Sequence, residues 1–341
     1  MRIPPAYEKT IELTRNLARL QSASTVLAKI PLSPIAKTNY ERTSLLHSAL
    51  FSARIEGNDL DLTDLTTSSQ AQKQVEVQNL QRALKYLQVK WAENSRKSID
   101  LALILALHKL VMAEVSQYPI GKLRNNVSAI FNGAGFAIYV PPAPSVVPGL
   151  LNDLISYINS KEDAIILAFL GHLVFEKIHP FFDGNGRVGR LLLKAVLLKE
   201  GYEALSFVSL EEAIDGKRDE YYSTFTSSAT RYLEFMSETL ATAAEKAIDQ
   251  LLQSKEESPK ELALLPRRQE ILNIIRDHGA VNFDTLHRRF LAINPRTLRY
   301  DIKYLIDHGF VQKQGTTRGV FYSLFSHTGT KPGEFDKHSG E

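Results

Sequence analysis

The sequence predicts a mostly α-helical protein with one small β-hairpin, followed by a second, basic domain that also begins with helices. Long apolar runs such as DAIILAFLGHLVFEKI and RLLLKAVLLKE repeat at helical spacing, with few β-branched alternations. The chain has 341 residues, and at roughly 150 residues per domain it is long enough for two domains. Residues 266–325 carry ten Lys/Arg and five Asp/Glu, a net charge of +5, whereas the remaining residues sum to −2.

The composition is typical of a folded globular protein. It is 44% hydrophobic and 23% charged, which excludes collagen-like and disordered classes. The absence of cysteine excludes disulfides, thiolate metal sites and cysteine nucleophiles, and it fits a reducing compartment, so we expect a cytoplasmic protein. The longest apolar stretch, Ala164–Phe175, contains His172 and is shorter than the roughly 20 residues of a membrane span. The N-terminus also lacks the apolar segment of a signal peptide.

Residues 1–98 form a predicted N-terminal helical region. A helix from about Ser44 is expected to end at Gly57, because glycine is a common helix stop. Glu56 then lies in the last turn, where the helix dipole disfavours an acid, so a positive group should lie nearby. In the predicted core, residues 99–236, two short apolar runs surround Asn132-Gly133-Ala134-Gly135 and predict a β-hairpin over residues 125–142.

The segment over residues 237–265 starts as a helix and becomes charged and broken at Pro259, which predicts a helical linker. After it, residues 266–325 show two helices and then a third that starts at Asn294-Pro295, where Asn is a good N-cap and Pro a good first residue. Two apolar runs around Gly315–Gly319 predict a two-stranded hairpin. The tail, residues 326–341, is expected to be disordered.

One loop carries most of the chemistry. The segment HPFFDGNGRVGR, residues 179–190, joins two apolar helices and contains an imidazole, a carboxylate, an amide, close glycines and two arginines. Its glycines allow backbone N–H groups to converge at the start of the next helix, and such an end binds anions. Arg187 and Arg190 are three residues apart and can both point to that anion, and Asp183 is placed to hold Mg²⁺. These residues predict a site for a metal-bound polyphosphate.

Two other phosphate motifs do not apply to this loop. Gly184, Gly186 and Gly189 match the spacing of the dinucleotide-binding fingerprint, but a long helical pattern and a proline precede them instead of a β-strand. The lysine of a P-loop is also absent.

This twelve-residue segment resembles the signature of Fic domains, His-x-Phe-x-Asp-Gly-Asn-Gly-Arg-x-x-Arg, and every fixed position is present. The resemblance implies a helical core with a β-hairpin flap and the transfer of AMP from ATP to a hydroxyl group of a target protein. Gly184 favours AMP transfer, because relatives that transfer a phosphoryl group have lysine there.

The resemblance also implies a role for each residue of the loop. His179 would be the general base, Phe181 a buried anchor and Asp183 the ligand of Mg²⁺. The phosphates would be bound by Gly184, Asn185 and Gly186 as an anion hole and by Arg187 and Arg190 at the β- and γ-phosphates.

Two further segments resemble nucleotide-binding parts of the family. The hairpin resembles the flap that aligns an extended target segment by backbone pairing, and Ser128, Ala129 and Ile130 are the expected nucleotide-facing positions. Tyr221-Tyr222 resembles the tyrosine pair that borders the adenine pocket, although a tyrosine pair on a helix is also common in core or surface packing.

The segment Ser52–Asn58 resembles the Fic inhibitory motif, Ser/Thr-x-x-x-Glu-Gly/Asn. In that motif the glutamate pairs with the second signature arginine, here Arg190, and blocks the γ-phosphate. The resemblance implies self-inhibition by Glu56, with Ser52 as the first motif residue. In some relatives the same glutamate positions water to remove AMP, so a dominant de-AMPylating hydrolase is an alternative.

The C-terminal domain resembles a winged helix-turn-helix. On the helix from Pro295, four residues form the expected buried stripe, which leaves Arg296, Arg299 and Lys303 for phosphates and guanine edges of DNA. Winged helices also serve as docking or dimerisation modules, so both uses remain open. The stripe consists of Leu298, Ile302, Leu305 and Ile306.

The sequence therefore favours a self-inhibited protein adenylyltransferase that uses ATP and Mg²⁺ and modifies a Ser, Thr or Tyr hydroxyl of a target protein or of itself. The alternative from another class is a DNA-binding regulator whose Fic core senses nucleotide without turnover. An intact His179 argues against that alternative, because a sensor needs the anion hole but no base. The oligomeric state, a homodimer included, is left open.

Overall fold

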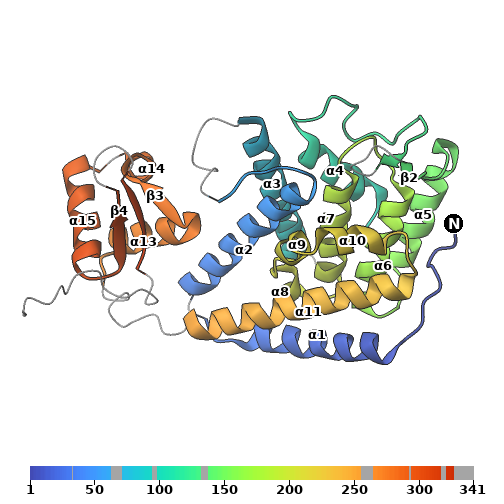
Figure 1. Cartoon of the computed structure of the whole chain (residues 1–341), viewed down its shortest axis with the longest axis horizontal. Coiled ribbons are helices and arrows are strands. Elements are labelled where there is room, and N and C mark those ends of the chain that lie inside the picture. Colours follow the sequence, from blue (N-terminus) through green and yellow to red (C-terminus); the bar gives the residue numbers. More distant parts are fainter. Residues whose placement is uncertain are drawn as a thin grey trace, which may run out of the picture. The chain divides into compact units, whose positions relative to one another are not determined.

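The computed structural model describes residues 1–32, 34–62, 71–93, 98–131, 137–254, 264–291, 293–315 and 320–325. The chain divides into two compact units, residues 1–61 with 67–256 and residues 62–66 with 257–341. Both are rich in helices (Figure 1), which confirms the predicted fold class.

Two central helices carry the hydrophobic core of the large unit. Helix α6 (Ala164–Ile178) packs against α7 (Asn185–Lys199), and both are buried along most of their length. The apolar residues of α6 continue around the helix, whereas α7 also buries polar side chains, which are Asn185, Arg187, Arg190 and Lys194. The side chain of Asp163 caps α6 by accepting hydrogen bonds from the N–H groups of Ile165 and Ile166, at 3.0 and 3.1 Å. The loop between these two helices is the signature segment, so the core itself fixes both ends of that loop.

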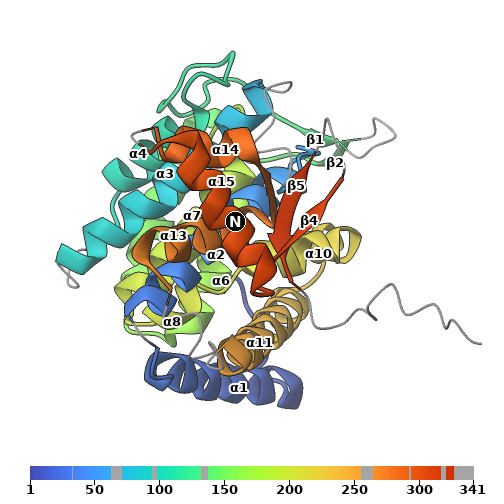
Figure 2. The ribbon, with the colours of Figure 1, turned by 90° about the vertical axis from the view of Figure 1, so that its left-hand side faces the viewer.

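Helices α1 (Ile11–Lys29) and α11 (Ala229–Ser254) lie side by side in both ribbon views (Figures 1 and 2). Arg19 of α1 forms ion pairs with Glu238, at 2.5 Å, and Glu245, at 2.8 Å. The expectation of a linker starting at Ser237 was therefore wrong. Residues 237–254 continue α11 within the large unit, because an apolar face that includes Leu240 and Ala244 is buried there.

Three helices from the N-terminal part of the chain pack against α7. They are α2 (Pro34–Ile55), α3 (Ala71–Glu93) and α4 (Leu101–Met112). The predicted hairpin is present, with β1 (Ile130–Phe131) antiparallel to β2 (Ala137–Tyr139), whereas the Asn132–Gly135 turn lies outside the described residues. The remaining elements are η3 (Pro144–Val146), α5 (Val147–Ile158), α8 (Glu203–Ser206), α9 (Leu210–Asp215) and α10 (Arg218–Thr224).

Within its described residues, the second unit contains three helices and a three-stranded antiparallel sheet in the order β3-β5-β4. The sequence predicted two strands, and β3 (Ala280–Asn282) is the additional one; with only three residues after Gly279 it is too short to show an alternating pattern. Three residues of the buried stripe expected on the last helix lie in the hydrophobic core of this unit. They are Leu298, Ile302 and Leu305. The other elements are α13 (Pro266–His278), α14 (Phe283–Arg289), α15 (Pro295–Asp307), β4 (Val311–Gln314) and β5 (Phe321–Leu324).

Within the described part of the chain, we find no helix that combines the length and the apolar character needed to cross a membrane. The expected disordered tail, residues 326–341, lies outside the described residues.

Candidate active site

The signature loop begins where α6 ends. His179 caps that helix in the left-handed conformation, with φ +50°, and its N–H donates to the carbonyl of Phe175 at 3.0 Å. Pro180 follows and cannot continue the helix. The imidazole is therefore held at the point where the chain turns from α6 toward α7.

The loop is closed by Asn185. Its side-chain oxygen accepts the N–H of Phe181 and its amide donates to the carbonyl of Phe181, both at 2.9 Å. The Phe181 ring is fully buried and stacks on His108, with ring centroids 3.8 Å apart. Phe181 thus lies where an anchor was expected. The side chain of Asn185 is used within the loop, so only its backbone N–H is available for an anion.

Helix α7 starts with a backbone suited to anion binding. Gly184 is its N-cap at φ +78°, a left-handed conformation that favours glycine, and a Cβ there would lie 2.5 Å from Sδ of Met112, so the Met112 side chain would have to shift. Asp183 accepts the N–H of Gly184 at 2.6 Å and pairs with Arg187 at 3.0 Å. The N–H groups of the first turn, which include that of Gly186, have no partner within the helix.

Arg190, from the second turn of α7, meets the end of α2. Its Nε donates to Oγ of Ser52 at 3.0 Å, and its Nη2 donates to the Ser52 carbonyl at 2.8 Å and to Oε1 of Glu56 at 3.0 Å. A Cβ on Gly186 would lie 2.3 Å from the same Glu56 oxygen. The carboxylate of Glu56 therefore occupies the N-terminal end of α7, the place where an anion is stabilised.

Arg124 connects the loop to the base of the hairpin. Its Nε donates to the carbonyl of His179 at 2.7 Å, and its Nη1 donates to the carbonyl of Asn126 at 3.1 Å. Its Nη2 donates to the carbonyl of Pro142, and its own N–H donates to Pro180 at 2.9 Å. One side chain thus connects His179 to the segments before and after the hairpin.

Burial lowers the pKa of His179 below its usual value of 6.5, and the positive charge of Arg124 lowers it further. The carbonyl of Glu176 and the carboxylates of Glu56 and Asp183 oppose this shift. The imidazole is therefore neutral at neutral pH, which is the form that can accept a proton. Since Nδ1 is buried, Nε2 is the nitrogen left to do so.

Tyr221 and Tyr222 have different environments. Tyr221 is buried in an aromatic cluster, where its hydroxyl lies 3.2 Å from Nε2 of His172, whereas Tyr222 is 42% exposed. The ring of Tyr221 packs against Phe225 in the core, and the expectation that Tyr221 borders a nucleotide stays a prediction. Tyr222 donates to the carbonyl of Ile55 at 3.0 Å, directly beside Glu56.

The expected flap positions lie in the first strand of the hairpin and in the segment before it. Ser128 and Ala129 are partly exposed in the segment that leads into β1, and Ile130 is the first residue of that strand.

Asp183 suits a Mg²⁺ ion that is shared with phosphate. Its side chain is half-exposed, and Oδ1 is held by Gly184 and Arg187. Clusters of three or more His, Cys, Asp or Glu that could enclose a metal are absent from the residues described here. Mg²⁺ typically uses one or two carboxylates together with substrate phosphates, and the donor set fits that arrangement.

The candidate DNA-contacting residues lie together on α15. Arg296, Arg299 and Lys303 are exposed. The guanidinium of Arg299 lies 4.2 Å from the ring centroid of Phe283, and Lys303 is 3.7 Å from Asp307.

Sequence reasoning missed several residues that shape the site, and each lies far along the chain from the signature loop. His108 and Arg124 contact the loop from α4 and from the segment after it. From the N-terminal region, Glu76 approaches Arg187, and Asn58 donates a hydrogen bond to Glu76. Common polar residues at such separations leave no spacing pattern, so only the folded chain identifies them.

The family comparison and the search of curated proteins both find similarity to Fic proteins. Residues 98–197 match the Fic/DOC family. A protein adenylyltransferase Fic of Aedes aegypti is 28% identical over 201 residues, which is 55% of this chain and 39% of that protein. The Drosophila virilis protein of the same name is 24% identical over 289 residues, 80% of this chain and 57% of its own length. The chain thus spans about half the length of these curated relatives, or less.

The fold is similar to that of a solved Fic family protein from Desulfovibrio desulfuricans G20. The TM-score is 0.64, and the match covers 96% of this chain and 99% of that protein at 21% identity. At this level of identity the similarity concerns the fold.

Proposed function

Since residues 98–197 are a Fic/DOC domain, we propose that this chain is a self-inhibited protein adenylyltransferase. It transfers AMP from ATP to a Ser, Thr or Tyr hydroxyl group of a protein, either a target or the chain itself. The observation that carries the proposal is the arrangement of a neutral imidazole and two arginines around the N-terminus of one helix.

The loop binds the phosphates of ATP. Backbone N–H groups of Asn185 and Gly186 would face the anion at the start of α7, whereas the N–H of Gly184 donates to Asp183. Arg187 and Arg190 bring two positive charges to the same helix end. Mg²⁺ held at Asp183 would neutralise charge on the phosphates and on the leaving pyrophosphate.

His179 acts on the target hydroxyl. Its imidazole takes the hydroxyl proton while that oxygen forms a bond to the α-phosphorus, and the bond from this phosphorus to the β-phosphate bridging oxygen breaks. Pyrophosphate leaves, and AMP remains on the target oxygen. Catalysis then depends mainly on position and on stabilisation of charge, which a rigid loop between two buried helices supplies.

Self-inhibition follows from the position of Glu56. Its carboxylate pairs with Arg190 at 3.0 Å and lies over Gly186, so it competes with a phosphate for the same cationic site. Ser52 supports the pair by accepting the Nε–H of Arg190. In this state ATP either binds weakly or lies in a pose that hides its α-phosphate from the hydroxyl. A carboxylate that instead positions water would make AMP removal the dominant activity.

The experiment is transfer of label from ATP labelled at the α-phosphate to protein. We expect little transfer by the wild type and at least about tenfold more by Glu56→Gly, which corresponds to about 1.4 kcal/mol in the transition state. Arg190→Ala should not reproduce this gain, because it removes the phosphate contact together with the inhibitory pair.

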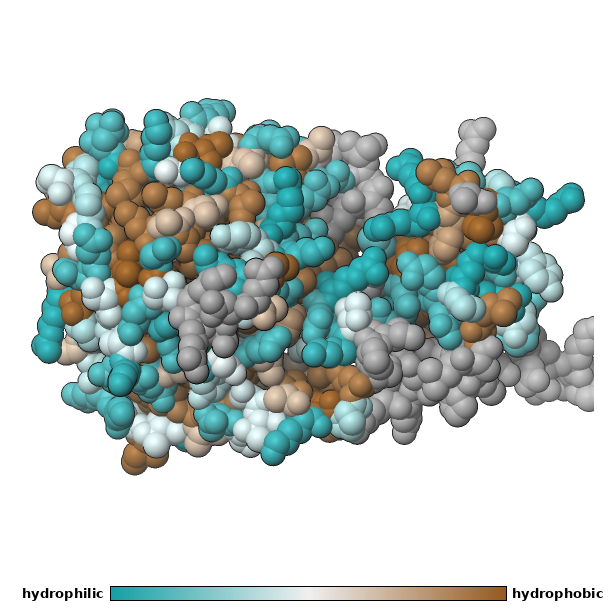
Figure 3. All heavy atoms as spheres, turned by 180° about the vertical axis from the view of Figure 1, so that it is seen from behind, coloured by the Kyte–Doolittle hydropathy of each residue, from teal (hydrophilic) through white to brown (hydrophobic). Residues whose placement is uncertain are grey.

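A second function, DNA binding, is favoured by the surface of α15. Arg296, Arg299 and Lys303 are exposed on one helix of an arrangement of three helices and a sheet that we interpret as a winged helix. On the face drawn in Figure 3, hydrophilic side chains are spread over this unit with hydrophobic ones between them. Such a surface suits phosphate contacts, and a regulator that senses nucleotide through its Fic core is the corresponding alternative.

A further inference from the structure

Arg187, the first arginine of the signature, also meets an acidic side chain from the N-terminal region. Oε1 of Glu76, on α3, lies 3.5 Å from its Nη1, while its Nη2 lies 3.0 Å from Oδ1 of Asp183. The Arg187 side chain is 7% exposed and its buried Nε has no hydrogen-bond partner. Two carboxylates thus share one guanidinium, and only Asp183 belongs to the signature.

Asn58 links this second carboxylate to the inhibitory turn, which we define as residues Ala53–Asn58. Its side-chain amide donates to Oε2 of Glu76 at 2.8 Å and to the carbonyl of Lys73 at 3.1 Å. Its side-chain oxygen accepts the N–H of Leu60 at 3.1 Å. Asn58 follows Glu56 by two residues, so the position of Glu56 depends on a side chain that is itself bound to Glu76.

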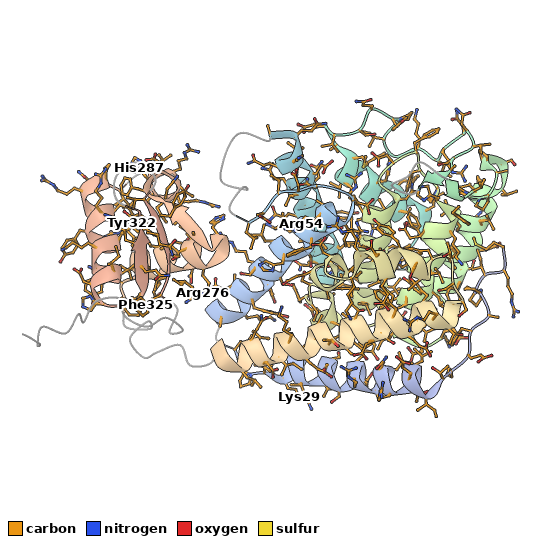
Figure 4. The ribbon with its side chains drawn as sticks, in the orientation of Figure 1. Lys29, Arg54, Arg276, His287, Tyr322 and Phe325 are labelled. Carbon is orange, nitrogen blue, oxygen red and sulfur yellow. The ribbon has the colours of Figure 1, made fainter. Side chains whose placement is uncertain are left out.

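The other side of the inhibitory turn is also fixed. Arg54, labelled on α2 in Figure 4, forms ion pairs with Asp61 at 2.5 Å and with Asp215 of α9 at 3.4 Å. The N–H groups of Glu56 and Asn58 both donate to the carbonyl of Ala53 at 3.1 Å. The turn is therefore tied to α9 through Arg54 and to Glu76 of α3 through Asn58. Glu56 pairs with Arg190 of the anion site, and Glu76 pairs with Arg187.

We propose that Glu76 is a second inhibitory carboxylate. It pairs with Arg187 while Glu56 pairs with Arg190, and Asn58 couples the release of Glu76 from Arg187 to the release of Glu56 from Arg190. The inference rests on the proposed function, because it assumes that both arginines serve a polyphosphate. Its ligand chemistry is specific: Glu76 opposes the β-phosphate, so it acts against nucleoside di- and triphosphates and not against a nucleoside monophosphate.

The charges around Arg187 favour inhibition over support. Asp183 alone already neutralises one positive charge, and Glu76 leaves the group with an excess negative charge where a phosphate must approach. Lys73, on the same helix as Glu76, is paired with Asp59 at 2.5 Å, so its charge is directed elsewhere. A Glu76 carboxylate 3.5 Å from the guanidinium repels a phosphate that approaches Arg187, so it weakens phosphate binding.

The experiment measures the binding of ADP and of AMP, each with Mg²⁺, by isothermal titration calorimetry on the full chain. Glu56→Gly is compared with the double variant Glu56→Gly/Glu76→Gln. We expect the second change to tighten ADP binding by about fivefold to tenfold, as for removal of one close carboxylate, and to leave AMP binding unchanged. Glu245→Gln, which removes an exposed ion pair with Arg19, is the matched control and should change neither nucleotide.

Four results would overturn the inference. Weaker ADP binding would mean that Glu76 orients Arg187 for the phosphate. Equal changes for ADP and AMP would mean a structural role. Unchanged ADP binding in a variant whose Glu56→Gly parent transfers AMP would remove this inference alone, whereas a parent that binds neither nucleotide would remove the proposed function as well.

Coupling through Asn58 has its own readout. The effects of Glu56→Gly and Glu76→Gln on ADP binding should be non-additive in the wild-type chain and become additive when Asn58→Ala is also present. Additivity in both backgrounds would reject the coupling. Far-UV circular dichroism checks that each variant is folded, and Glu76→Ala serves as a second variant if Glu76→Gln is not.

Discussion

The buried carboxyl group of Glu176 makes the stability of the large unit depend on pH. Burial is the main cause, and the nearby carboxylate of Glu56 adds to it; together they raise the pKa of Glu176 from 4.5 to about 8, although Arg190 acts in the opposite direction. Its Oε1 is buried without a hydrogen-bond partner and lies 2.1 Å from where a Cβ on Gly189 would be. Glu176 is therefore protonated in the folded chain at neutral pH.

The sign of the effect follows from the two pKa values. Between pH 4.5 and about 8 the folded chain keeps a proton that the unfolded chain releases, so the free energy of unfolding falls as pH rises through this window and then levels off. At about 1.4 kcal/mol per pKa unit, the full loss is on the order of 2–5 kcal/mol once local relaxation is included. Glu176→Gln removes the ionisable proton, so it should be nearly neutral at pH 5 and stabilising by this amount at pH 8.

Urea unfolding at pH 5, 7 and 9 measures this difference. Trp91 is the single tryptophan, it lies in α3 and it is 5% exposed, so its fluorescence reports on the large unit alone. In Glu56→Gly the upper end of the window should move to lower pH, because the folded-state pKa of Glu176 loses the raising charge of Glu56 and Arg190 is released. A stability difference between wild type and Glu176→Gln that stays constant from pH 5 to pH 9 would refute the reasoning.

Three further outcomes are expected. Asp183→Ala should weaken Mg²⁺-ATP binding and turnover together, by about tenfold or more, and an unchanged Mg²⁺ dependence would contradict its role as a ligand. Arg124→Ala should lower AMP transfer in a Glu56→Gly background while ATP binding is kept, since it separates the hairpin from the catalytic base; equal losses in binding and transfer would indicate general unfolding. Changing Arg296, Arg299 and Lys303 to Ala should flatten the salt dependence of DNA binding by about 0.9 in log-log slope per lost phosphate contact, whereas an unchanged slope would favour a docking module.

Much of the fold could be predicted from local patterns. The apolar periodicity of α6 and α7 and the Asn-Pro start of α15 have physical causes within a few residues, so the sequence alone reveals them. The end of α11 could not be placed in this way. Its residues alternate between buried apolar side chains and charged ones, two of which pair with Arg19 of α1, and a mixed composition of this kind also occurs in linkers.

The same distinction applies to the site. Glu56 and Arg190 could be paired in advance because both belong to recognisable segments, and the structure places them 3.0 Å apart. Tyr221 could not be separated from Tyr222, because neighbouring residues on a helix point in different directions and the sequence does not say which direction is the core. Glu76 carries no motif and depends entirely on how α3 packs beside α7.

The most direct test of the central claim is AMP transfer from α-labelled ATP to protein by Glu56→Gly and by Glu56→Gly/His179→Ala, at saturating Mg²⁺-ATP and with nucleotide binding measured in parallel. We expect transfer by the first variant, with self-modification detectable before any added target, and no transfer but unchanged ATP binding by the second. Equal transfer rates for the wild type and Glu56→Gly would contradict self-inhibition, and equal rates for the two variants would contradict the assignment of His179 as the base.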